Sequence, residues 1–352
     1  MSVSVFDHPW LSALLGDDEV AHYFRPEVEL SAMMRVETTL ARVQAELGLI
    51  SAEAARAISA TLQNFQPRMT DLAAGTARDG VVVPDWVDQM RHAVGPQHAR
   101  ELHFGATSQD IVDTAFILRL KPILTIFDAR LVALDQALAV LTDKAGTRPL
   151  QAYTRMQAAI EITWADKFMA WRAPLRRHRD RLAELSPRLL VVQLGGPAGT
   201  LDKFGDRGSA LVQSFAAALG LGAPPGAWHS ARDTIAELAG WLSLVSGSLG
   251  KIGQDIALLA QMGAIVLAGG GKSSAMPHKS NPVPAEALVA LARFNATQLS
   301  GIHHAVVHEQ ERSGAAWTLE WMILPQMIVA TAASLSRAAA LLDADVLSIQ
   351  GS

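Results

Sequence analysis

The sequence predicts an all-α protein built around a bundle of long helices. Apolar residues recur at helical spacing along most of the 352 residues, whereas stretches that alternate with period two are almost absent. Tyrosine, which favours strands, occurs only twice. The clearest seam has steps of three and four residues, typical of helices that pack lengthwise. It consists of Ile235, Leu238, Leu242, Val245, Leu249, Ile252, Ile256 and Leu259.

Five long helices are expected in the second part of the chain. Their ranges are 108–144, with a kink at Pro122, 156–185, 231–267, a fourth helix from about 284 and a fifth from about 317 almost to the C-terminus. No proline interrupts the third of these, and Ser230 followed by Asp233 fits an N-cap with an acidic third position. That helix would be roughly 55 Å long, a length that helix bundles use.

The first part of the chain differs from the second. Shorter helices are expected over 26–47 and 51–64, followed by a stretch rich in glycine and proline over 75–105. We therefore predict two domains: an N-terminal helical domain over 1–104 and a central long-helix bundle domain over 105–352. The second domain carries an unusual polar loop at 269–284.

Composition and charge exclude several classes of protein. The chain has no cysteine, which excludes disulfides, thiolate zinc sites and cysteine nucleophiles. A net charge of −4 and an aromatic content of only 6% disfavour nucleic-acid binding. The N-terminus lacks the basic segment of a secretory signal, so we expect a soluble cytoplasmic protein without membrane or nucleic-acid partners.

The eleven histidines do not form a recognisable metal-binding pattern. His303 and His304 are adjacent, so on a helix they point about 100° apart. His308 is followed by Glu309, but the second histidine of an HExxH motif is missing. We predict neither a metal nor another cofactor.

The polar loop reads GGGKSSAMPHKSNPVP and interrupts apolar, helical surroundings. It is not a phosphate-binding P-loop, because Val266 occupies the position of the required first glycine. One interpretation is a simple connector between helices, since glycine and serine commonly make turns. The other is a lid that carries chemistry, because Lys272, Lys279 and Asn281 gather cations and donors beside a glycine hinge.

The same loop resembles the GSSxMPxKxNP signature of the fumarase/aspartase superfamily. The match covers the serine pair Ser273–Ser274, Met276–Pro277, Lys279 and Asn281–Pro282 at the expected spacings. The resemblance implies that the loop closes over an anionic substrate, with Ser273 as the general base. It also implies that Lys279 and Asn281 bind substrate carboxylate, and it leaves open which of the two serines reacts.

Two further stretches support this resemblance. The segment 103–114 is similar to the superfamily's TSxDxxDT region, where Thr107 or Ser108 caps a helix together with Asp110. Capping explains Thr107 and Asp110 by itself, but a helix N-terminus also binds anions, so the two roles are compatible. His103 precedes that helix end and could reach the same ligand.

A third stretch, 153–158, is similar to the superfamily's RTHxQxA region but departs from it. Arg155 stands where many of these lyases have a histidine, while Gln157 is retained. Arginine cannot donate a proton at neutral pH and instead offers a bidentate grip on a carboxylate. The segment 193–200 resembles another glycine-rich turn of the superfamily, and it is also explained as a connector between helices.

The segments 6–17, 33–50 and 308–321 look most like the lactonizing branch of this superfamily, the 3-carboxy-cis,cis-muconate cycloisomerases. That resemblance implies conversion of 3-carboxy-cis,cis-muconate to 4-carboxymuconolactone, in protocatechuate degradation. It also implies a homotetramer whose active sites combine segments from three subunits. Superfamily chains usually continue into a small third domain, and we expect that domain to be absent here. Two alternatives are a fumarate-releasing lyase of the adenylosuccinate or argininosuccinate type and a catalytically silent helical scaffold.

For a tricarboxylate substrate, the resemblance gives each candidate residue a role. Proton transfer falls to Ser273, with His103 as the second candidate, and Lys279 acts beside the serine. Carboxylate binding falls to residues that offer cations or hydrogen-bond donors: Thr107, Ser108, Arg155, Gln157, Ser274, Lys279 and Asn281. His308 and Arg312 are expected to line the same cleft.

Overall fold

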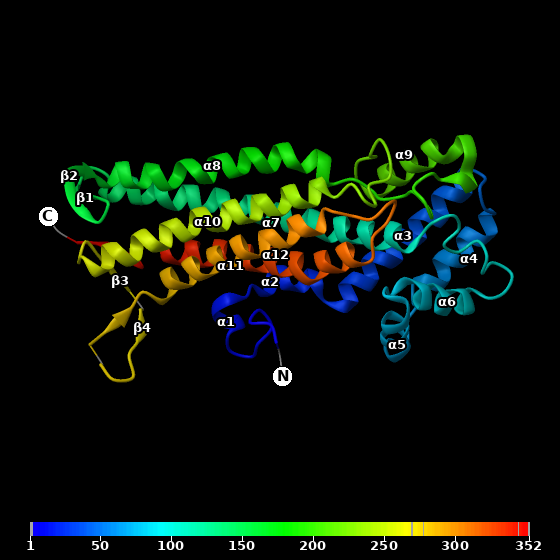
Figure 1. Ribbon diagram of the computed structural model, residues 1–352, viewed down its shortest axis with the longest axis horizontal. Coiled ribbons are helices and arrows are strands. Elements are labelled where there is room, and N and C mark those ends of the chain that lie inside the picture. The colour runs from blue at the N-terminus through cyan, green and yellow to red at the C-terminus, as the bar shows by residue number, and fades with distance from the viewer. Residues whose placement is uncertain (1–2, 269, 277, 344, 351–352) are drawn as a thin grey trace.

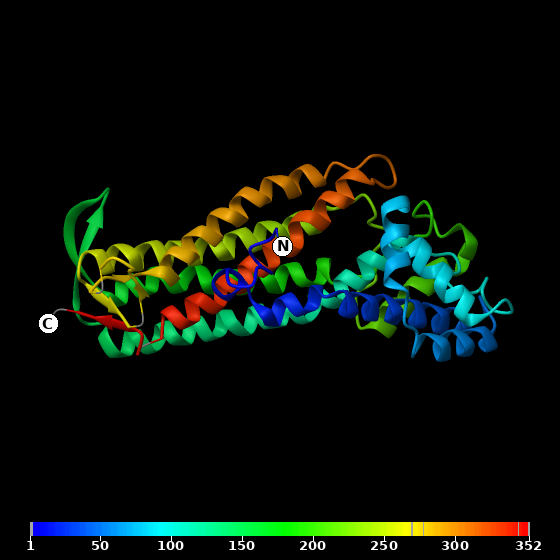
Figure 2. The same ribbon diagram turned by 90° about the horizontal axis from the view of Figure 1, so that it is seen from below.

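Five long helices run side by side along an elongated molecule and form its body (Figures 1 and 2). The computed structural model describes residues 3–268, 270–276, 278–343 and 345–350. Gly269 and Pro277 of the predicted loop lie outside the described residues. The five helices are α7 (Ser108–Ala145), α8 (Trp164–Leu189), α10 (Asp233–Gln261), α11 (Val283–Ala305) and α12 (Ala315–Leu341). The predicted all-α class is therefore confirmed, with three two-stranded sheets added to it within the described residues.

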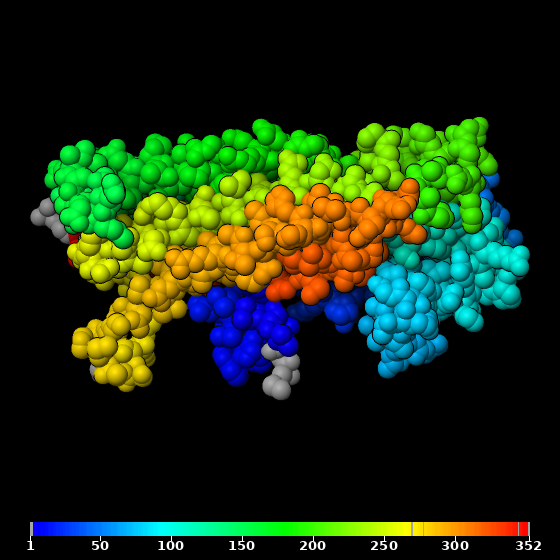
Figure 3. All heavy atoms as spheres, in the orientation of Figure 1, coloured from blue at the N-terminus to red at the C-terminus, as the bar shows by residue number. Residues whose placement is uncertain are grey.

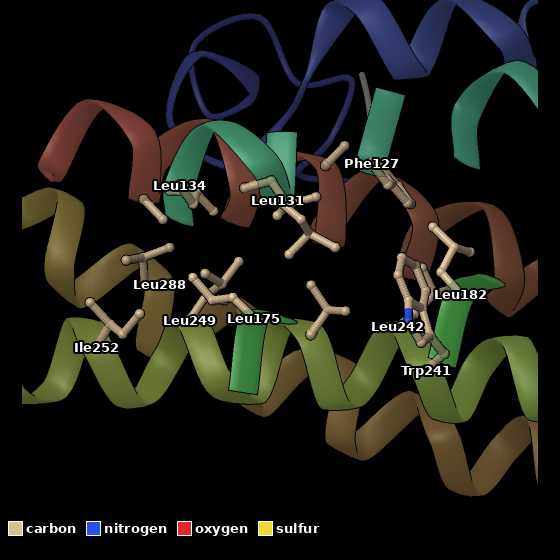
Figure 4. Close-up of a cluster of buried hydrophobic side chains, with 14 of the residues drawn as sticks. Phe127, Leu131, Leu134, Leu175, Leu182, Trp241, Leu242, Leu249, Ile252 and Leu288 are labelled. Atoms are coloured by element: carbon tan, nitrogen blue, oxygen red, sulfur yellow. The ribbon is translucent and has the colours of Figure 1, made fainter. Parts of the chain in front are cut away.

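The predicted seam of α10 is buried in the centre of the bundle. Every seam residue from Ile235 to Leu259 is at most 4% exposed, and all of them belong to one hydrophobic core. Figure 4 shows α10 side chains such as Leu249 meeting Leu131 of α7, Leu175 of α8 and Leu288 of α11. Burying each leucine contributes roughly 1.5–3 kcal/mol, so this seam is a principal stabilising contact.

Helix α12 is the most apolar of the five long helices. By length and composition alone it could cross a membrane, but 67% of its most apolar window is buried inside the protein. Residues on several sides of the helix, including Met327, Ile328 and Leu335, are fully buried. A helix that is apolar all round fits the interior of a bundle.

A second core lies at one end of the bundle. It is formed by α3 (Pro26–Glu46), α4 (Ala52–Leu62), α5 (Met69–Asp79), α6 (Val83–Val94) and α9 (Gly208–Leu219), which gather at the right of Figure 1. The shorter elements are α1 (Ser12–Leu15), α2 (Asp18–Ala21) and the 3₁₀ helices His22–Phe24 and Asp202–Arg207. This core also takes in Ile111 of α7, so it extends past the predicted boundary at residue 105.

The prediction that the second long helix begins near Met156 is wrong. Residues Pro149–Thr154 (β1) and Gln157–Thr163 (β2) form an antiparallel hairpin, and α8 begins only at Trp164. Arg155 and Met156 form its two-residue turn with φ of 49° and 65°, as a type I′ hairpin turn requires. Thr163 then caps α8 in a capping box with Asp166, which fixes the later start.

Three other helix ends differ from the predictions. Helix α10 ends at Gln261, because Gly263 turns the chain at φ 74° and Ile265–Leu267 (β3) pairs with Leu347–Ile349 (β6). Helix α12 ends at Leu341, before the chain reaches β6 at Leu347. The N-cap of α10 is Arg232 and not Ser230. The first long helix and the capping position at Thr107 are confirmed.

Candidate active site

The start of α7 is anchored by the carboxylate of Asp110. Its Oδ2 accepts hydrogen bonds from the backbone N–H groups of Thr107 at 3.0 Å and Gly196 at 2.9 Å. Its Oδ1 accepts from Gly195 N–H at 2.9 Å and lies 2.8 Å from His229 Nε2. Because Asp110 is 1% exposed, these four partners hold the helix N-terminus firmly against the glycine-rich turn at 193–200.

That turn requires glycine where it meets the segment before α7. A Cβ added to Gly196 would lie 2.8 Å from the carbonyl oxygen of Gly105, and Gly196 has a φ of 68°. A Cβ on Gly105 would lie 2.1 Å from the ring of Phe204, at a φ of 72°. The predicted turn therefore serves as a support for the N-terminus of α7.

Several predicted site residues gather at this helix end. The guanidinium of Arg312, in the loop between α11 and α12, donates a hydrogen bond to Thr107 Oγ1. His103 lies four residues before Thr107, and its Nδ1 is 2.5 Å from Glu37 Oε1 on α3. A helix N-terminus flanked by an arginine and a histidine is suited to bind an anion.

A buried ionic cluster lies behind this helix end. Arg232 donates to Asp113 on α7 and to Glu320 on α12, and Trp317 Nε1 also donates to Asp113. Burial alone would lower the pKa of Arg232, but the two carboxylates raise it. Burial raises the pKa of Glu320. These ion pairs join the first helix of the bundle to the last.

His308 packs against the same cluster. Its side chain is 1% exposed, and its Nε2 lies 3.7 Å from Glu320 Oε1. Burial and the nearby charge of Arg232 lower the pKa of His308, which favours the neutral form of the ring. The ring of His308 therefore lies on the buried side of the α7 N-terminus, against the ionic cluster, and not on the side where Thr107 and Arg312 lie.

A cavity of about 520 Å³ adjoins this region. It lies between α3, α5, α7 and α12 and is lined mainly by apolar side chains such as Met33, Leu72 and Leu324, with Asp113, Arg232 and Glu320 along part of its wall. His103, Thr107 and Arg312 are not among its lining residues. The cavity and the open end of α7 are therefore neighbouring but separate features.

The predicted signature loop forms a second group, at the other end of the bundle. Its arms pair as Gly271–Lys272 (β4) and Ser280–Asn281 (β5). A Cβ on Gly270 would lie 2.0 Å from Ser280 Oγ and 3.0 Å from the backbone oxygen of Asn281, so a larger residue there would require the serine side chain to move. Lys272, Ser274 and Lys279 are exposed. Figure 3 shows the loop as a projection from the side of the bundle on which the N-terminal segment and α5 also protrude.

Within this loop the Ser273 hydroxyl has a distinct environment. Its Oγ accepts hydrogen bonds from the backbone N–H of Met276 at 3.1 Å and of Ala275 at 3.4 Å. Backbone donors aimed at one oxygen stabilise negative charge on it. The local geometry is therefore that of a small oxyanion site around Ser273.

Arg155 and Gln157 form a third group on the β1–β2 hairpin. Both are exposed, as are Tyr153, Met156 and Ile160 on the same hairpin. The hairpin follows the C-terminus of α7, whose 38 residues place it about 57 Å from Thr107. Within one chain, the hairpin and the signature loop thus do not meet the helix end that holds Thr107 (Figure 1).

Comparison with known proteins gives the family. A model of the lyase family matches residues 18–295 of this chain, and the chain belongs to that family. The resemblance to the fumarase/aspartase superfamily inferred from the loop is thereby confirmed.

Individual relatives are similar along nearly the whole chain. The 3-carboxy-cis,cis-muconate cycloisomerase of Pseudomonas aeruginosa is 36% identical, over 91% of this chain and 72% of the relative. The crystal structure of the 3-carboxy-cis,cis-muconate lactonizing enzyme from Pseudomonas putida has a TM-score of 0.91 at 34% identity, covering 97% of this chain and 78% of that one. A fumarate lyase structure from Mesorhizobium sp. BNC1 has a TM-score of 0.88 at 34% identity, covering 95% and 76%.

Proposed function

We propose that the protein is a 3-carboxy-cis,cis-muconate cycloisomerase, which converts its substrate to 4-carboxymuconolactone in the cytoplasm during protocatechuate degradation. The observation that carries the proposal is the similarity to cycloisomerases over more than nine tenths of the chain. The cationic serine loop and the arginine-flanked helix N-terminus add chemistry suited to a substrate with three carboxylates.

The reaction is an isomerisation and needs no co-reactant. One carboxylate oxygen of the substrate forms a C–O bond with a carbon of the conjugated double bond. The π electron pair of the double bond moves toward the carboxylate conjugated with it. The carbon next to that carboxylate then takes up a proton. Because nucleophile and alkene belong to one molecule, orienting the carboxylate matters more than activating it.

Each group of residues has a part in this scheme. Thr107, Ser108 and Arg312 bind one carboxylate at the N-terminus of α7. Lys279, Asn281 and Ser274 bind substrate from the signature loop, and Arg155 and Gln157 do so from the hairpin. Ser273 transfers the proton, because backbone N–H groups stabilise its alkoxide. His103 is the second candidate for this step, and His308 supports the cleft from behind.

The enzyme acts as a homotetramer in which each active site combines segments of different subunits. The separation of about 57 Å between the hairpin and Thr107 supports this, because the groups cannot act together within one chain. The signature loop and α5 protrude from the same side at opposite ends (Figure 3), so a copy lying antiparallel would bring its loop toward this chain's helix end. Exposed apolar residues such as Ile160 and Met322 favour such contacts.

A fumarate-releasing lyase is the second candidate, favoured by the similarity to the fumarate lyase structure from Mesorhizobium sp. BNC1. Such an enzyme would use the same serine loop to remove a proton beside a carboxylate. The two candidates differ in product, since only the lyase splits its substrate in two. Assays for fumarate with adenylosuccinate and argininosuccinate therefore separate them.

The activity test uses the purified protein and 3-carboxy-cis,cis-muconate, with EDTA present. Rapid loss of the ultraviolet absorbance of the diene is expected in wild type. Ser273→Ala should lose at least about 100-fold in kcat, as removal of a general acid–base group does, and should fold normally. The matched variant Ser274→Ala should lose less than about 10-fold in kcat. The reason is that the backbone N–H groups of the loop donate to the hydroxyl of Ser273 in the described structure. Normal turnover by Ser273→Ala would refute the assignment.

A further inference from the structure

Glu37 is an acidic residue at a core position of α3. The helix buries an apolar stripe that includes Met33, Val36 and Leu40, and Glu37 lies on this stripe with 1% exposure. A buried carboxylate is unfavourable unless it is paired. An apolar residue at this position would serve the core better, so the presence of Glu37 requires another explanation.

Its partner is His103, at the edge of the candidate active site. The Nδ1 atom of His103 lies 2.5 Å from Glu37 Oε1, which is the one hydrogen bond of this carboxylate in the described parts of the chain. The His103 side chain is 13% exposed, and its backbone has a φ of 60°, a conformation that non-glycine residues rarely adopt. Such strain is typically retained where a side chain must be aimed.

A second buried polar residue of α3 supports the same segment. Gln44 lies seven residues after Glu37, on the same face of the helix, and its Nε2 donates to the carbonyl of Phe104 at 2.7 Å. Gln44 is also 1% exposed. Two polar side chains in an otherwise apolar stripe thus hold residues 103 and 104, just before the helix end that bears Thr107.

We propose that Glu37 is a positioning residue that aims His103 at the substrate. An ionised carboxylate only accepts hydrogen bonds, so Nδ1 of His103 carries a proton and Nε2 is left for the ligand. Nε2 makes no hydrogen bond with the described residues. It accepts a proton when the ring is neutral and donates one when the ring is charged. This inference rests on the proposed function and adds a residue to the site.

Substitution of Glu37 separates positioning from a structural role. Glu37→Met should fold as well as wild type, with a melting temperature within about 2 °C or higher, because it removes a buried carboxylate. Its kcat should fall about 10–100-fold, by analogy with the loss seen when a carboxylate that orients a metal-binding histidine is removed. Glu37→Gln should recover most of that loss, because the amide oxygen still accepts from Nδ1. Glu46→Gln, on the exposed surface of α3, should behave as wild type.

A double-mutant cycle with His103→Gln provides the decisive comparison. If Glu37 acts through His103, Glu37→Met should add less than about two-fold to the loss caused by His103→Gln. The proposal would be overturned if the losses in kcat caused by the two substitutions multiply in the double variant. It would also be overturned if Glu37→Met lowers the melting temperature but leaves kcat intact. A wild type that does not turn over the diene refutes the proposed function alone. In that case a crystal structure tests the Glu37–His103 contact. A His103 Nδ1 atom beyond hydrogen-bond distance of Glu37 would overturn the pair.

Discussion

Replacing Asp110 with asparagine should destabilise the protein strongly, although the two side chains have the same shape. The carboxylate accepts four hydrogen bonds, two at each oxygen, from Thr107, Gly195, Gly196 and His229. The asparagine NH₂ group cannot accept a hydrogen bond, so it leaves unpaired either the N–H groups of Thr107 and Gly196 or that of Gly195, where the His229 ring can switch tautomer and accept. Each buried donor left unpaired costs about 1–3 kcal/mol, and at least one is left, so we expect a loss of at least about 1–3 kcal/mol in the free energy of unfolding.

The assay is guanidinium unfolding followed by circular dichroism, at equal protein concentration because assembly stabilises the folded state. Asp128→Asn is the matched control. Asp128 also lies on α7, but its pair with Arg179 is 43% exposed on both side chains, so its loss should be below about 1 kcal/mol. If Asp110→Asn loses no more than Asp128→Asn, the anchoring role assigned to this carboxylate is wrong.

Two further predictions concern the support of the site and the core. Gly105→Ala should lower the melting temperature by several degrees and reduce kcat, since its Cβ would lie 2.1 Å from the Phe204 ring at a positive φ; unchanged stability in differential scanning calorimetry would contradict this. His178 is buried, and burial together with Arg181 and Arg177 lowers its pKa to about 4. The unfolded chain therefore binds this proton below about pH 6.5 and the folded chain only near pH 4, so stability should fall by up to about 3 kcal/mol as the pH drops through that interval. His178→Gln should remove most of this loss, and an equal loss in the variant would exclude His178 as its cause.

The elements that could be predicted from the sequence are those with a strong local pattern. The seam of α10 and the capping box at Thr107 and Asp110 both depend on residues three or four positions apart, and both are present. The β1–β2 hairpin was missed because Arg155 and Met156 occupy a turn that usually selects asparagine and glycine. Its strands are also largely exposed, so apolar alternation is weak.

The candidate site was predictable only in part. The loop residues and the segment before α7 lie in compact motifs, whereas Glu37 and His103 are 66 residues apart and Asp113 and Arg232 are 119 apart. Spacing along a chain does not reveal such contacts. The one available signal was an acidic residue inside the apolar stripe of α3. The domain boundary at residue 105 and the roles of the site residues stay predictions.

The most direct test of the central claim is to identify the product by NMR. The purified protein is mixed with 3-carboxy-cis,cis-muconate in D₂O, and the spectrum is followed to completion. The account predicts a single lactone that carries one deuterium on the carbon next to the carboxylate, with no fumarate. An unchanged diene would contradict it, and fumarate released from adenylosuccinate or argininosuccinate in a parallel sample would place the protein among the fumarate-releasing lyases.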